Sequence, residues 1–388
     1  MDFNETAEHG MLREAVRKIG LDFGHDYYVE KSQTKGGMSE LWAAVARAGF
    51  IGVNIPEEYG GGGMGLLELS MVGEELAAAG CPALLMVVSP AICGSVIAKH
   101  GTEEQKRTWL PKIAGAEDPS YKMAFAITEP DAGSNSHKIS TTATRDGDEY
   151  ILRGTKYYIS GVEESQQMLV VTRTGLDENS GRGKLSLFVV DTDTPGLERT
   201  VIPMEILAPD KQWTLFFDEV RVPADRLIGG TEHDGLRQVF SGLNPERVMG
   251  AAQGNGISRY ALAKASQYAL DRQVWGVPIG MHQGLSHPLA IAKIEVEQAR
   301  LMTQKAAWLY DQGADAGEAA NMAKYASAEA SLKALDQAIQ THGGNGLTTE
   351  YGLATLYGIT RLFRTAPVSR EMVLNFVAQH SLGLPKSY

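Results

Sequence analysis

Glu246 is a carboxylate placed where it could either support a helix or do chemistry. It lies between Pro245 and Arg247 in the stretch "FSGLNPERVMGAAQG", residues 240–254. Asn244 is a preferred N-cap residue, and Pro245 suits the first position of a helix. We therefore predict that a helix begins here and that Glu246 faces the positive end of its dipole. This local pattern alone favours a structural role, so a role as general base needs support from the rest of the chain.

Four other stretches carry residue types suited to holding a cofactor. "FAITEPDAGSN", residues 125–135, has the pattern of a strand that ends in a tight turn, where small residues let the main chain approach a planar ring. "GTKYYISG", residues 154–161, places aromatic and hydroxyl side chains on a strand pattern. "DRQVWGVPIGMHQ", residues 271–283, offers a guanidinium that matches phosphate geometry, and "QTHGGNG", residues 340–346, offers glycines. Taken singly, each stretch has an ordinary explanation as a turn, a strand, a surface arginine or a helix C-cap.

The elements that must position these residues change character twice along the chain. Residues 5 to about 115 carry apolar residues at three- and four-residue spacings, which predicts helices. From residue 121, short β-rich runs alternate with turn residues, including a hairpin turn at 145–148, and from about residue 234 long helical patterns return. We predict a multidomain α+β protein with an N-terminal α-helical domain, a central antiparallel β-barrel domain and a C-terminal four-helix bundle, over residues 1–120, 121–232 and 233–388.

Composition narrows the class of protein. The chain has 388 residues, of which 43% are hydrophobic, and is long enough for two or three domains. Its net charge of −11 argues against nucleic acid or an anionic membrane as the main partner. Cys81 and Cys93 are too few for a disulfide framework and fit a reducing compartment. No apolar run approaches the length of a membrane span, and the acidic start lacks the features of a secretion or transit signal, so we expect a cytoplasmic protein without membrane insertion.

Two familiar kinds of site are not expected. Gly60, Gly62 and Gly65 satisfy the pattern G-x-G-x-x-G, but the residues before them form a poor strand and no βαβ unit follows, which argues against a Rossmann phosphate loop. Three histidines of the C-terminal part, His282, His287 and His342, have no metal-like spacing with carboxylates or cysteines, so we expect no metal.

In their order and spacing, the four cofactor stretches resemble the motifs of the acyl-CoA dehydrogenase flavoprotein family, and the resemblance covers nearly the whole chain. "FAITEPDAGSN" resembles the family's Thr-Glu-Pro-x-Ala-Gly-Ser, and "QTHGGNG" resembles its Gln-x-x-Gly-Gly-x-Gly. "DRQVWGVPIGMHQ" resembles Arg-x-x-Phe-Gly-x-Pro-Ile-x-x-x-Gln. In "GTKYYISG", Tyr158 and Ser160 stand where many relatives carry the Trp and Thr that flank the isoalloxazine. The resemblance implies FAD as the cofactor.

The resemblance also implies that cofactor-binding residues come from two subunits. Gly133 and Ser134 match residues at the flavin pyrophosphate or the pantetheine of the substrate, whereas Arg272 would hold the flavin pyrophosphate of a neighbouring subunit. Arg247 and Ser134 are the implied substrate-binding residues. The full implied cofactor-binding set is Phe125, Ile127, Thr128, Gly133, Ser134, Tyr158, Ser160, Arg272, Trp275, Gln283, Gln340, Gly343, Gly344 and Ser369.

The catalytic base usual in this family is missing. Most members supply it from a Tyr-Glu-Gly-Thr stretch near the C-terminus, which falls here on "TAPVSRE", with Pro367 at the glutamate position and Ser369 at the threonine position. Glu371 lies four residues too late. A minority of the family, including isovaleryl-CoA and long-chain acyl-CoA dehydrogenases, carries the base in a Glu-Arg pair that opens the first long C-terminal helix, and "NPER" fits that pattern. The resemblance therefore implies that Glu246 is the base.

Pro367 raises a second question. In the family, the main-chain N–H of the usual glutamate position helps to polarise the thioester carbonyl, and proline has no N–H. Losing one such donor typically costs ~10²–10³ in rate. Either a neighbouring amide such as that of Val368 substitutes, or the flavin ribityl hydroxyl acts without it, or the chemistry is not ordinary dehydrogenation.

The implied activity is dehydrogenation of an acyl-CoA to the trans-2-enoyl-CoA, in which Glu246 takes the α-proton and flavin N5 takes the β-hydride. Electrons would pass to an electron-transfer flavoprotein, and a homotetramer is the usual state of the family. Three alternatives stay open: an acyl-CoA oxidase, an enoyl-CoA reductase of the same fold, or a non-catalytic acyl-CoA-binding subunit. The length and branching of the acyl chain are not predictable, because scattered helical side chains shape the acyl cavity.

Overall fold

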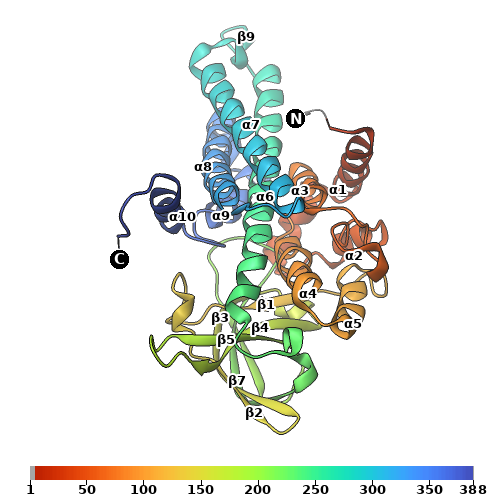
Figure 1. Cartoon of the computed structure of the whole chain (residues 1–388). Coiled ribbons are helices and arrows are strands. Elements are labelled where there is room, and N and C mark those ends of the chain that lie inside the picture. Colours follow the sequence, from red (N-terminus) through yellow and green to blue (C-terminus); the bar gives the residue numbers. More distant parts are fainter. Residues whose placement is uncertain (1–4, 388) are drawn as a thin grey trace.

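The computed structural model describes residues 5–387, which form a helical N-terminal part, a curled β-sheet and a helical C-terminal part (Figure 1). This confirms the predicted order of the three parts. Helix ends follow local capping: the Thr6 side chain accepts from the backbone N–H of His9, and Thr102 and Gln105 form a reciprocal capping box. The N-terminal helices are α1 (Ala7–Thr34), α2 (Ser39–Arg47), α3 (Leu66–Ala78), α4 (Ser95–His100) and α5 (Glu103–Ile113), with a π-helical segment over Val87–Gly94.

The central sheet has the strand order β1-β4-β2-β3-β7-β6, and β5 pairs with the outer side of β4. Most neighbours are antiparallel, including the predicted hairpin at 145–148, which joins β2 to β3. β1 and β2 instead run parallel to β4. The strands are β1 (Met123–Ala126), β2 (Thr142–Asp146), β3 (Glu149–Ser160), β4 (Gln167–Leu176), β5 (Gly183–Asp191), β6 (Leu197–Ile202) and β7 (Gln212–Pro223).

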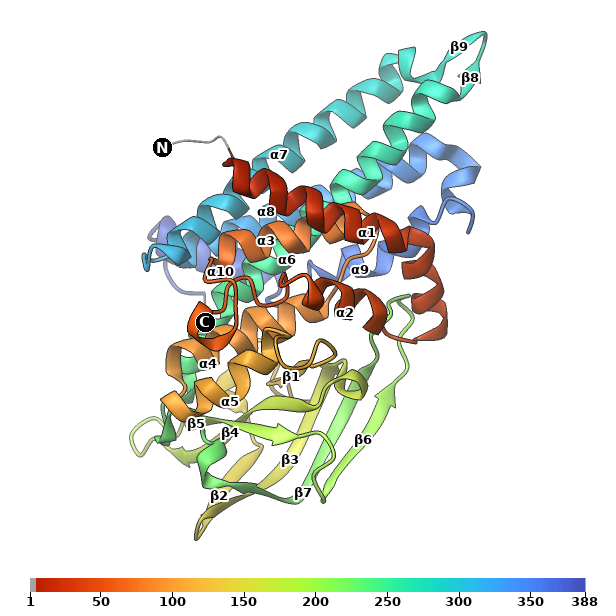
Figure 2. The same ribbon diagram turned by 90° about the vertical axis from the view of Figure 1, so that its right-hand side faces the viewer.

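Three long helices dominate the C-terminal part, and a small hairpin, β8 (Gln273–Val274) and β9 (Val277–Pro278), joins the first two at the end farthest from the sheet (Figure 2). The predicted fourth helix is the short α10, which packs on α8 together with α9. The helices are α6 (Gly235–Asp271), α7 (Gln283–Asp311), α8 (Gly317–His342), α9 (Tyr357–Leu362) and α10 (Arg370–Phe376).

Two glycines explain how closely α6 packs against its neighbours. A Cβ on Gly254 would lie 2.5 Å from Ser327 Oγ of α8, and a Cβ on Gly256 would lie 2.3 Å from the carbonyl oxygen of Glu74 in α3. Both distances are too short for any side chain. The Ala- and Gly-rich sequence after Glu246 therefore lets α3 and α8 approach α6 from two sides, which joins the N-terminal helices to the C-terminal bundle.

The predicted helix start at Asn244 and Pro245 is wrong. α6 begins at Gly235, and Pro245 lies inside it. The residues before Pro245 continue the helix because Gln238, Val239 and Gly242 are buried, with the backbone of Gly242 close to Val96 of α4. Burial of this extra length offsets the cost of an internal proline, ~3 kcal/mol. Glu246 is therefore three turns from the helix N-terminus, where the dipole has little effect on it.

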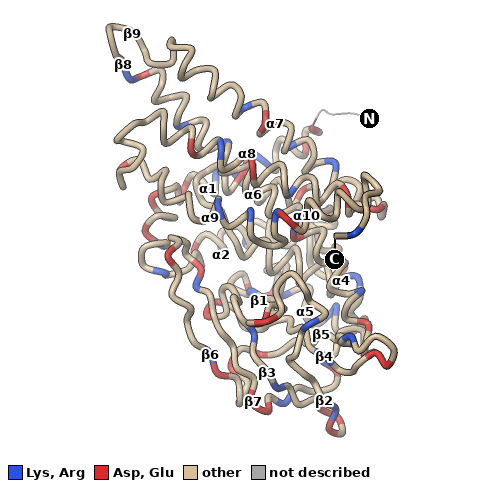
Figure 3. The backbone as a smooth tube through the Cα atoms, turned by 90° about the vertical axis from the view of Figure 1, so that its left-hand side faces the viewer, with Lys and Arg blue, Asp and Glu red and all other residues tan. Residues whose placement is uncertain are grey.

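Charged residues of both signs are interspersed along the chain, as Figure 3 shows. Within residues 5–387, no helix combines the length and the apolar character that crossing a membrane requires. The most concentrated charges lie in a buried cluster between helices. Glu74 and Glu75 of α3 meet Arg13 of α1, Arg259 of α6 and Arg300 of α7, with 2.7 Å between Arg13 Nη1 and Glu75 Oε1 and 2.6 Å between Arg300 Nε and Glu74 Oε1. This cluster ties four helices together.

Replacing Glu75 by glutamine should destabilise the fold. Glu75 is only 2% exposed and pairs with two arginines. Its loss therefore leaves Arg13 and Arg259 to share Glu74 as their buried partner, at a cost of up to about 3–5 kcal/mol. The midpoint of urea unfolding should fall clearly, whereas the exposed control Glu117→Gln should leave it unchanged. An unchanged midpoint in Glu75→Gln would show that the cluster does not hold these helices together.

Candidate active site

Glu246 lies on α6 and remains partly exposed to solvent. Burial raises the pKa of its carboxyl group to about 7, and the positive charges of Arg247 and Lys324 oppose that increase. Burial, followed by the charge of Glu246, raises the pKa of the Cys93 thiol, so the segment Val87–Gly94 also lies close to Glu246. A carboxyl group in this environment can exchange a proton near neutral pH, as a general base must.

Pro367, at the position of the usual base, lies beside the same stretch of α6. A Cβ added to Gly250 would be 3.7 Å from Pro367 Cδ. Gly250 is four residues after Glu246, so both lie on one face of the helix, about one turn apart. Two positions separated by 121 residues in sequence, 246 and 367, are thus neighbours in the fold. Ser369 caps α10 here, where its hydroxyl accepts from the backbone N–H of Met372.

The predicted residues of the sheet form one group. Phe125 belongs to β1, and Ile127 and Thr128 follow it directly. The backbone N–H of Tyr157 donates to the carbonyl of Thr128 over 2.8 Å, which joins this segment to β3. On β3, Tyr158 is 50% exposed, and Ser160 donates to Gln212 Oε1 over 3.0 Å. The exposed Gly133 and Ser134 stand in the turn that follows β1.

An ion pair that the sequence did not reveal holds this group together. Lys156 Nζ of β3 lies 2.9 Å from Glu129 Oε1 and also donates to the carbonyl of Ile127 over 3.0 Å. The Glu129 carboxylate further accepts from Ser140 and from the backbone N–H of Thr141. Lys156 and Glu129 are 0% and 3% exposed. Burial alone would raise the pKa of Glu129, but the Lys156 charge and these donors hold it at about 2.

A second group of predicted residues lies at the far end of the C-terminal helices. Tyr268 of α6 stacks on His342 of α8, with ring centroids 4.3 Å apart, and its hydroxyl accepts from Asn345 over 3.1 Å. These contacts bring the end of α6 beside the glycines that follow α8. Trp275 stands at the tip of the hairpin with 87% of its side chain exposed. The exposed members of this group are Arg272, Trp275, Gln283, Gln340, Gly343 and Gly344.

The two groups are not brought together within one chain. The β8–β9 hairpin and the sheet lie at opposite ends of the molecule (Figure 2). Along α6, the 25 residues from Glu246 to Asp271 correspond to roughly 38 Å at 1.5 Å per residue. Within one chain, each group of predicted residues is therefore separate from the other and at least partly exposed. We refer to the two groups below as the halves of the predicted site.

Both halves suit a large planar cofactor with a diphosphate. Tyr158 offers an exposed aromatic face, and Cβ atoms added to Gly133, Gly343 or Gly344 would meet no atom within 4 Å. Within residues 5–387, the exposed Arg272 has no ion-pair partner, so its guanidinium is available to a phosphate. In the same range, His, Cys, Asp and Glu side chains form no group of three or more that could hold a metal ion.

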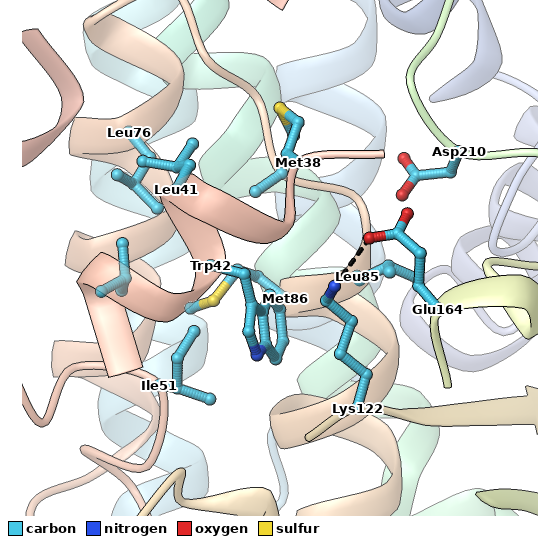
Figure 4. Close-up of a pocket in the computed structure, with 12 residues that line it drawn as sticks. Met38, Leu41, Trp42, Ile51, Leu76, Leu85, Met86, Lys122, Glu164 and Asp210 are labelled. Carbon is cyan, nitrogen blue, oxygen red and sulfur yellow. Dashed lines mark hydrogen bonds and ion pairs between the residues drawn. The ribbon is translucent and has the colours of Figure 1, made fainter. Parts of the chain in front are cut away.

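A small internal cavity lies elsewhere, between α2, α3 and the sheet (Figure 4). Its volume of about 20 Å³ suits a single water molecule rather than an acyl chain. Lys122 Nζ donates to Glu164 Oε2 over 2.6 Å at one end, and Asp210 faces Glu164 there. Burial and the charges of Glu164 and Glu163 raise the pKa of Asp210 to about 7. This cavity is part of the contact between helices and sheet.

Three family models match the chain in consecutive segments. They are the acyl-CoA dehydrogenase N-terminal domain over residues 6–117, its middle domain over residues 124–219 and its C-terminal domain over residues 233–382. The chain is 58% identical to the acyl-CoA dehydrogenase FadE12 of Mycobacterium tuberculosis (strain ATCC 25618 / H37Rv), with 100% of this chain and 99% of that protein covered. It is 33% identical to the glutaryl-CoA dehydrogenase of Desulfococcus multivorans, with 100% of both covered.

Solved structures agree with these matches. A glutaryl-coenzyme A dehydrogenase in complex with glutaryl-CoA superimposes with a TM-score of 0.92 at 32% identity, covering 100% of this chain and 98% of that one. Butyryl-CoA dehydrogenase from Megasphaera elsdenii gives a TM-score of 0.92 at 27% identity, covering 98% of this chain and 100% of that one. The similarity thus extends over all three parts of the fold.

Replacing Lys156 by methionine should weaken the sheet half of the site. The Glu129 carboxylate would stay buried without its cation, which costs about 3–5 kcal/mol. With a folded-state pKa of about 2, Glu129 stabilises the wild type fully above its unfolded pKa, and this contribution is lost as the pH falls towards 2. In Lys156→Met the pKa of Glu129 rises towards or above its unfolded value, so the loss of stability on acidification should become smaller or reverse.

Thermal unfolding between pH 7 and pH 3 measures this effect. The matched control is Arg153→Met on the same strand, which removes an exposed ion pair with Glu219 and should change little. Equal unfolding temperatures for Lys156→Met and Arg153→Met across this pH range would show that the Glu129–Lys156 ion pair does not stabilise this part of the fold.

Proposed function

The chain belongs to the acyl-CoA dehydrogenase family of FAD-dependent oxidoreductases, and from that premise we propose that it converts an acyl-CoA to the trans-2-enoyl-CoA with Glu246 as the catalytic base. The adjacency of positions 246 and 367 carries this proposal. Pro367 cannot act as a base, and Glu246 supplies a carboxylate on the α6 face beside it. What matters for proton transfer is the position of the carboxylate oxygen relative to the substrate, and not its place in the sequence.

The residues of this chain have separable tasks in the reaction. Bound FAD supplies the acceptor for the hydride that leaves the β-carbon. Glu246 removes the α-proton, and its pKa of about 7 places it near the range in which a base is both ionised and basic. Arg247 and Lys324 favour the ionised form of Glu246. The Glu129–Lys156 pair holds the segments with Ile127 and Thr128 in place, and these residues, with Tyr158 and Ser160, would line the flavin ring.

Acyl-CoA is the proposed substrate, with Ser134 and Arg247 among the groups that contact it, and an electron-transfer flavoprotein is the proposed electron acceptor. One structural neighbour, with a TM-score of 0.93 at 28% identity, comes from a study titled for the electron transferring flavoprotein of Acidaminococcus fermentans. A dehydrogenase should stop turning over in air unless an electron acceptor is added, because its reduced flavin is not reoxidised efficiently by oxygen. An oxidase should continue to turn over in air and form peroxide.

Replacing Glu246 by glutamine should slow flavin reduction by at least about 100-fold, because the side chain can no longer accept the α-proton. The rate for the wild type should rise as the pH increases through about 7, as the Glu246 carboxyl group loses its proton. Anaerobic mixing with acyl-CoAs of several chain lengths, followed by flavin absorbance, measures both effects.

The matched control is Glu371→Gln, which removes an exposed glutamate close to the usual base position. It should keep most of the rate of the wild type. A near-normal rate in Glu246→Gln, or a large loss in Glu371→Gln alone, would reject Glu246 as the base.

We also propose that the flavin site is completed by a second copy of the chain, within a homotetramer. The two halves lie at opposite ends of one chain, so Arg272, Gln340 and Gly344 would reach a flavin only on another copy. α7 further exposes an apolar stripe at seven-residue spacing, Ile294, Leu301 and Trp308, which is 58%, 50% and 48% exposed. Such a stripe is typical of a surface that packs against another helix.

Complementation between inactive variants tests the shared site. Arg272→Ala and Tyr158→Ala should each lose FAD and activity, since each damages one half. Co-expressed copies should regain about one quarter of the activity of the wild type if assembly is random, because half of the paired units would carry one intact site of two. No recovery, or a monomer that binds FAD fully in analytical ultracentrifugation, would contradict the proposal.

A further inference from the structure

Lys324 is a buried cation with an unusual partner. It lies on α8 with only 2% of its surface exposed, and its ammonium group donates to the backbone carbonyl of Val368. Within residues 5–387, no carboxylate lies within ion-pair distance of this ammonium group. Burying a charge costs free energy unless nearby groups compensate it, so the burial of Lys324 needs a physical explanation.

The carbonyl that Lys324 holds belongs to the segment beside Glu246. Pro367 packs against α6 at Gly250, one turn from Glu246, and its ring restricts the backbone on that side. Lys324 fixes the following residue from α8. Val368 is therefore held from both sides, by a proline ring against one long helix and by a hydrogen bond from another.

The backbone N–H of Val368 is free. In the part of the chain that the structure describes, it donates to no backbone or side-chain acceptor. It is also the first N–H after Pro367, which has none. An N–H without a partner, on a segment that is itself fixed, has the properties of an oxyanion-hole donor, because no reorganisation is needed when charge develops on a nearby oxygen.

We propose that Lys324 is a positioning residue, which holds Val368 so that its backbone N–H donates to the thioester carbonyl oxygen of the substrate, in place of the donor missing at Pro367. This inference rests on the proposed function. Donation to that oxygen stabilises the enolate-like charge that forms as Glu246 removes the α-proton. Lys324 does not touch the reacting atoms and acts through the position of Val368 and through its charge.

The charge of Lys324 gives a second, independent signature. Burial raises the pKa of Glu246, and the positive charges of Arg247, on the same helix, and of Lys324, on α8, lower it. The Cys93 thiol of the segment Val87–Gly94 also lies near Glu246. Burial and the charge of Arg247 lower the pKa of Lys324, and the charges of three carboxylates raise it, those of Glu371, Glu246 and Glu329. Removing the positive charge of Lys324 should therefore raise the pKa of Glu246 and move the pH dependence of the reaction upwards.

The decisive variant is Lys324→Met, which keeps the length of the side chain and removes both the donor and the charge. The FAD-loaded enzyme is mixed with a 3-thia-acyl-CoA, which cannot be oxidised at the β-position, carrying ¹³C at the thioester carbonyl. The infrared carbonyl frequency then reports polarisation directly. The wild type should lower this frequency relative to free thioester, and Lys324→Met should lower it less.

Flavin reduction by an oxidisable acyl-CoA completes the test. Lys324→Met should be roughly tenfold to hundredfold slower, with its pH midpoint shifted upwards. Lys324→Arg, which keeps a donor and a charge, should restore much of both properties. The control Lys333→Met removes an exposed lysine of the same helix, paired with Glu295, and should match the wild type in every measurement.

A carbonyl frequency, rate and pH midpoint in Lys324→Met equal to those of the wild type would overturn the inference while leaving the proposed function intact. If Lys324→Met proves unstable, replacing Val368 by its α-hydroxy acid removes only the backbone N–H, and an unchanged carbonyl frequency in that ester variant would equally overturn it. A wild type whose flavin no acyl-CoA reduces would instead reject the proposed function, and this inference with it. Glu246→Gln separates proton removal from carbonyl polarisation, since it should slow flavin reduction and still lower the infrared carbonyl frequency of the bound thioester.

Discussion

The uninterrupted course of α6 through Pro245 is the constraint on which the candidate site depends. An internal proline removes a backbone hydrogen bond and costs ~3 kcal/mol, so the helix continues only because the residues on both sides of it are buried. Gly242 packs against α4 before the proline, and Gly254 and Gly256 pack against α8 and α3 after it. This packing fixes the rotation of α6 about its axis. It therefore fixes the face on which Glu246 and Gly250 lie.

Two glutamates, one buried and one partly exposed, show how the surroundings decide the chemistry of one residue type. Glu129 receives hydrogen bonds from Lys156, Ser140 and Thr141, which hold its pKa at about 2 and keep it charged. Glu246 has positive charges nearby, but none of the hydrogen bonds within residues 5–387 involves its carboxylate, and burial raises its pKa to about 7. The first arrangement suits a structural anion. The second leaves a carboxylate whose oxygens are available to a substrate proton.

Much of the fold and of the site could be predicted from the sequence, and the failures have physical causes. Patterns of apolar residues predicted the three parts in the observed order. The motifs predicted the two groups of cofactor-binding residues, and their contact with a flavin stays a prediction. The start of α6 was missed because Asn-Pro is a strong local signal, whereas the burial that overrides it involves α4, which is distant in sequence. The Glu129–Lys156 pair was missed for a similar reason. The local sequence does not distinguish a strand lysine whose side chain is solvated from one whose side chain pairs with a carboxylate on another segment.

The proposed base on α6 changes what the segment 365–369 has to do. In a chain with its base in that segment, one residue supplies both the carboxylate and the backbone donor. In the proposed mechanism the carboxylate comes from a rigid helix, so the segment is free to contain Pro367, provided that it still presents a donor at the right place. The connection between α9 and α10 is tied to α8 on both sides of Pro367, because Arg364 and Arg370 pair with Glu329. Lys324 adds a contact from the same helix between these two arginines: within residues 5–387 it has no carboxylate partner, and it donates instead to the carbonyl of Val368.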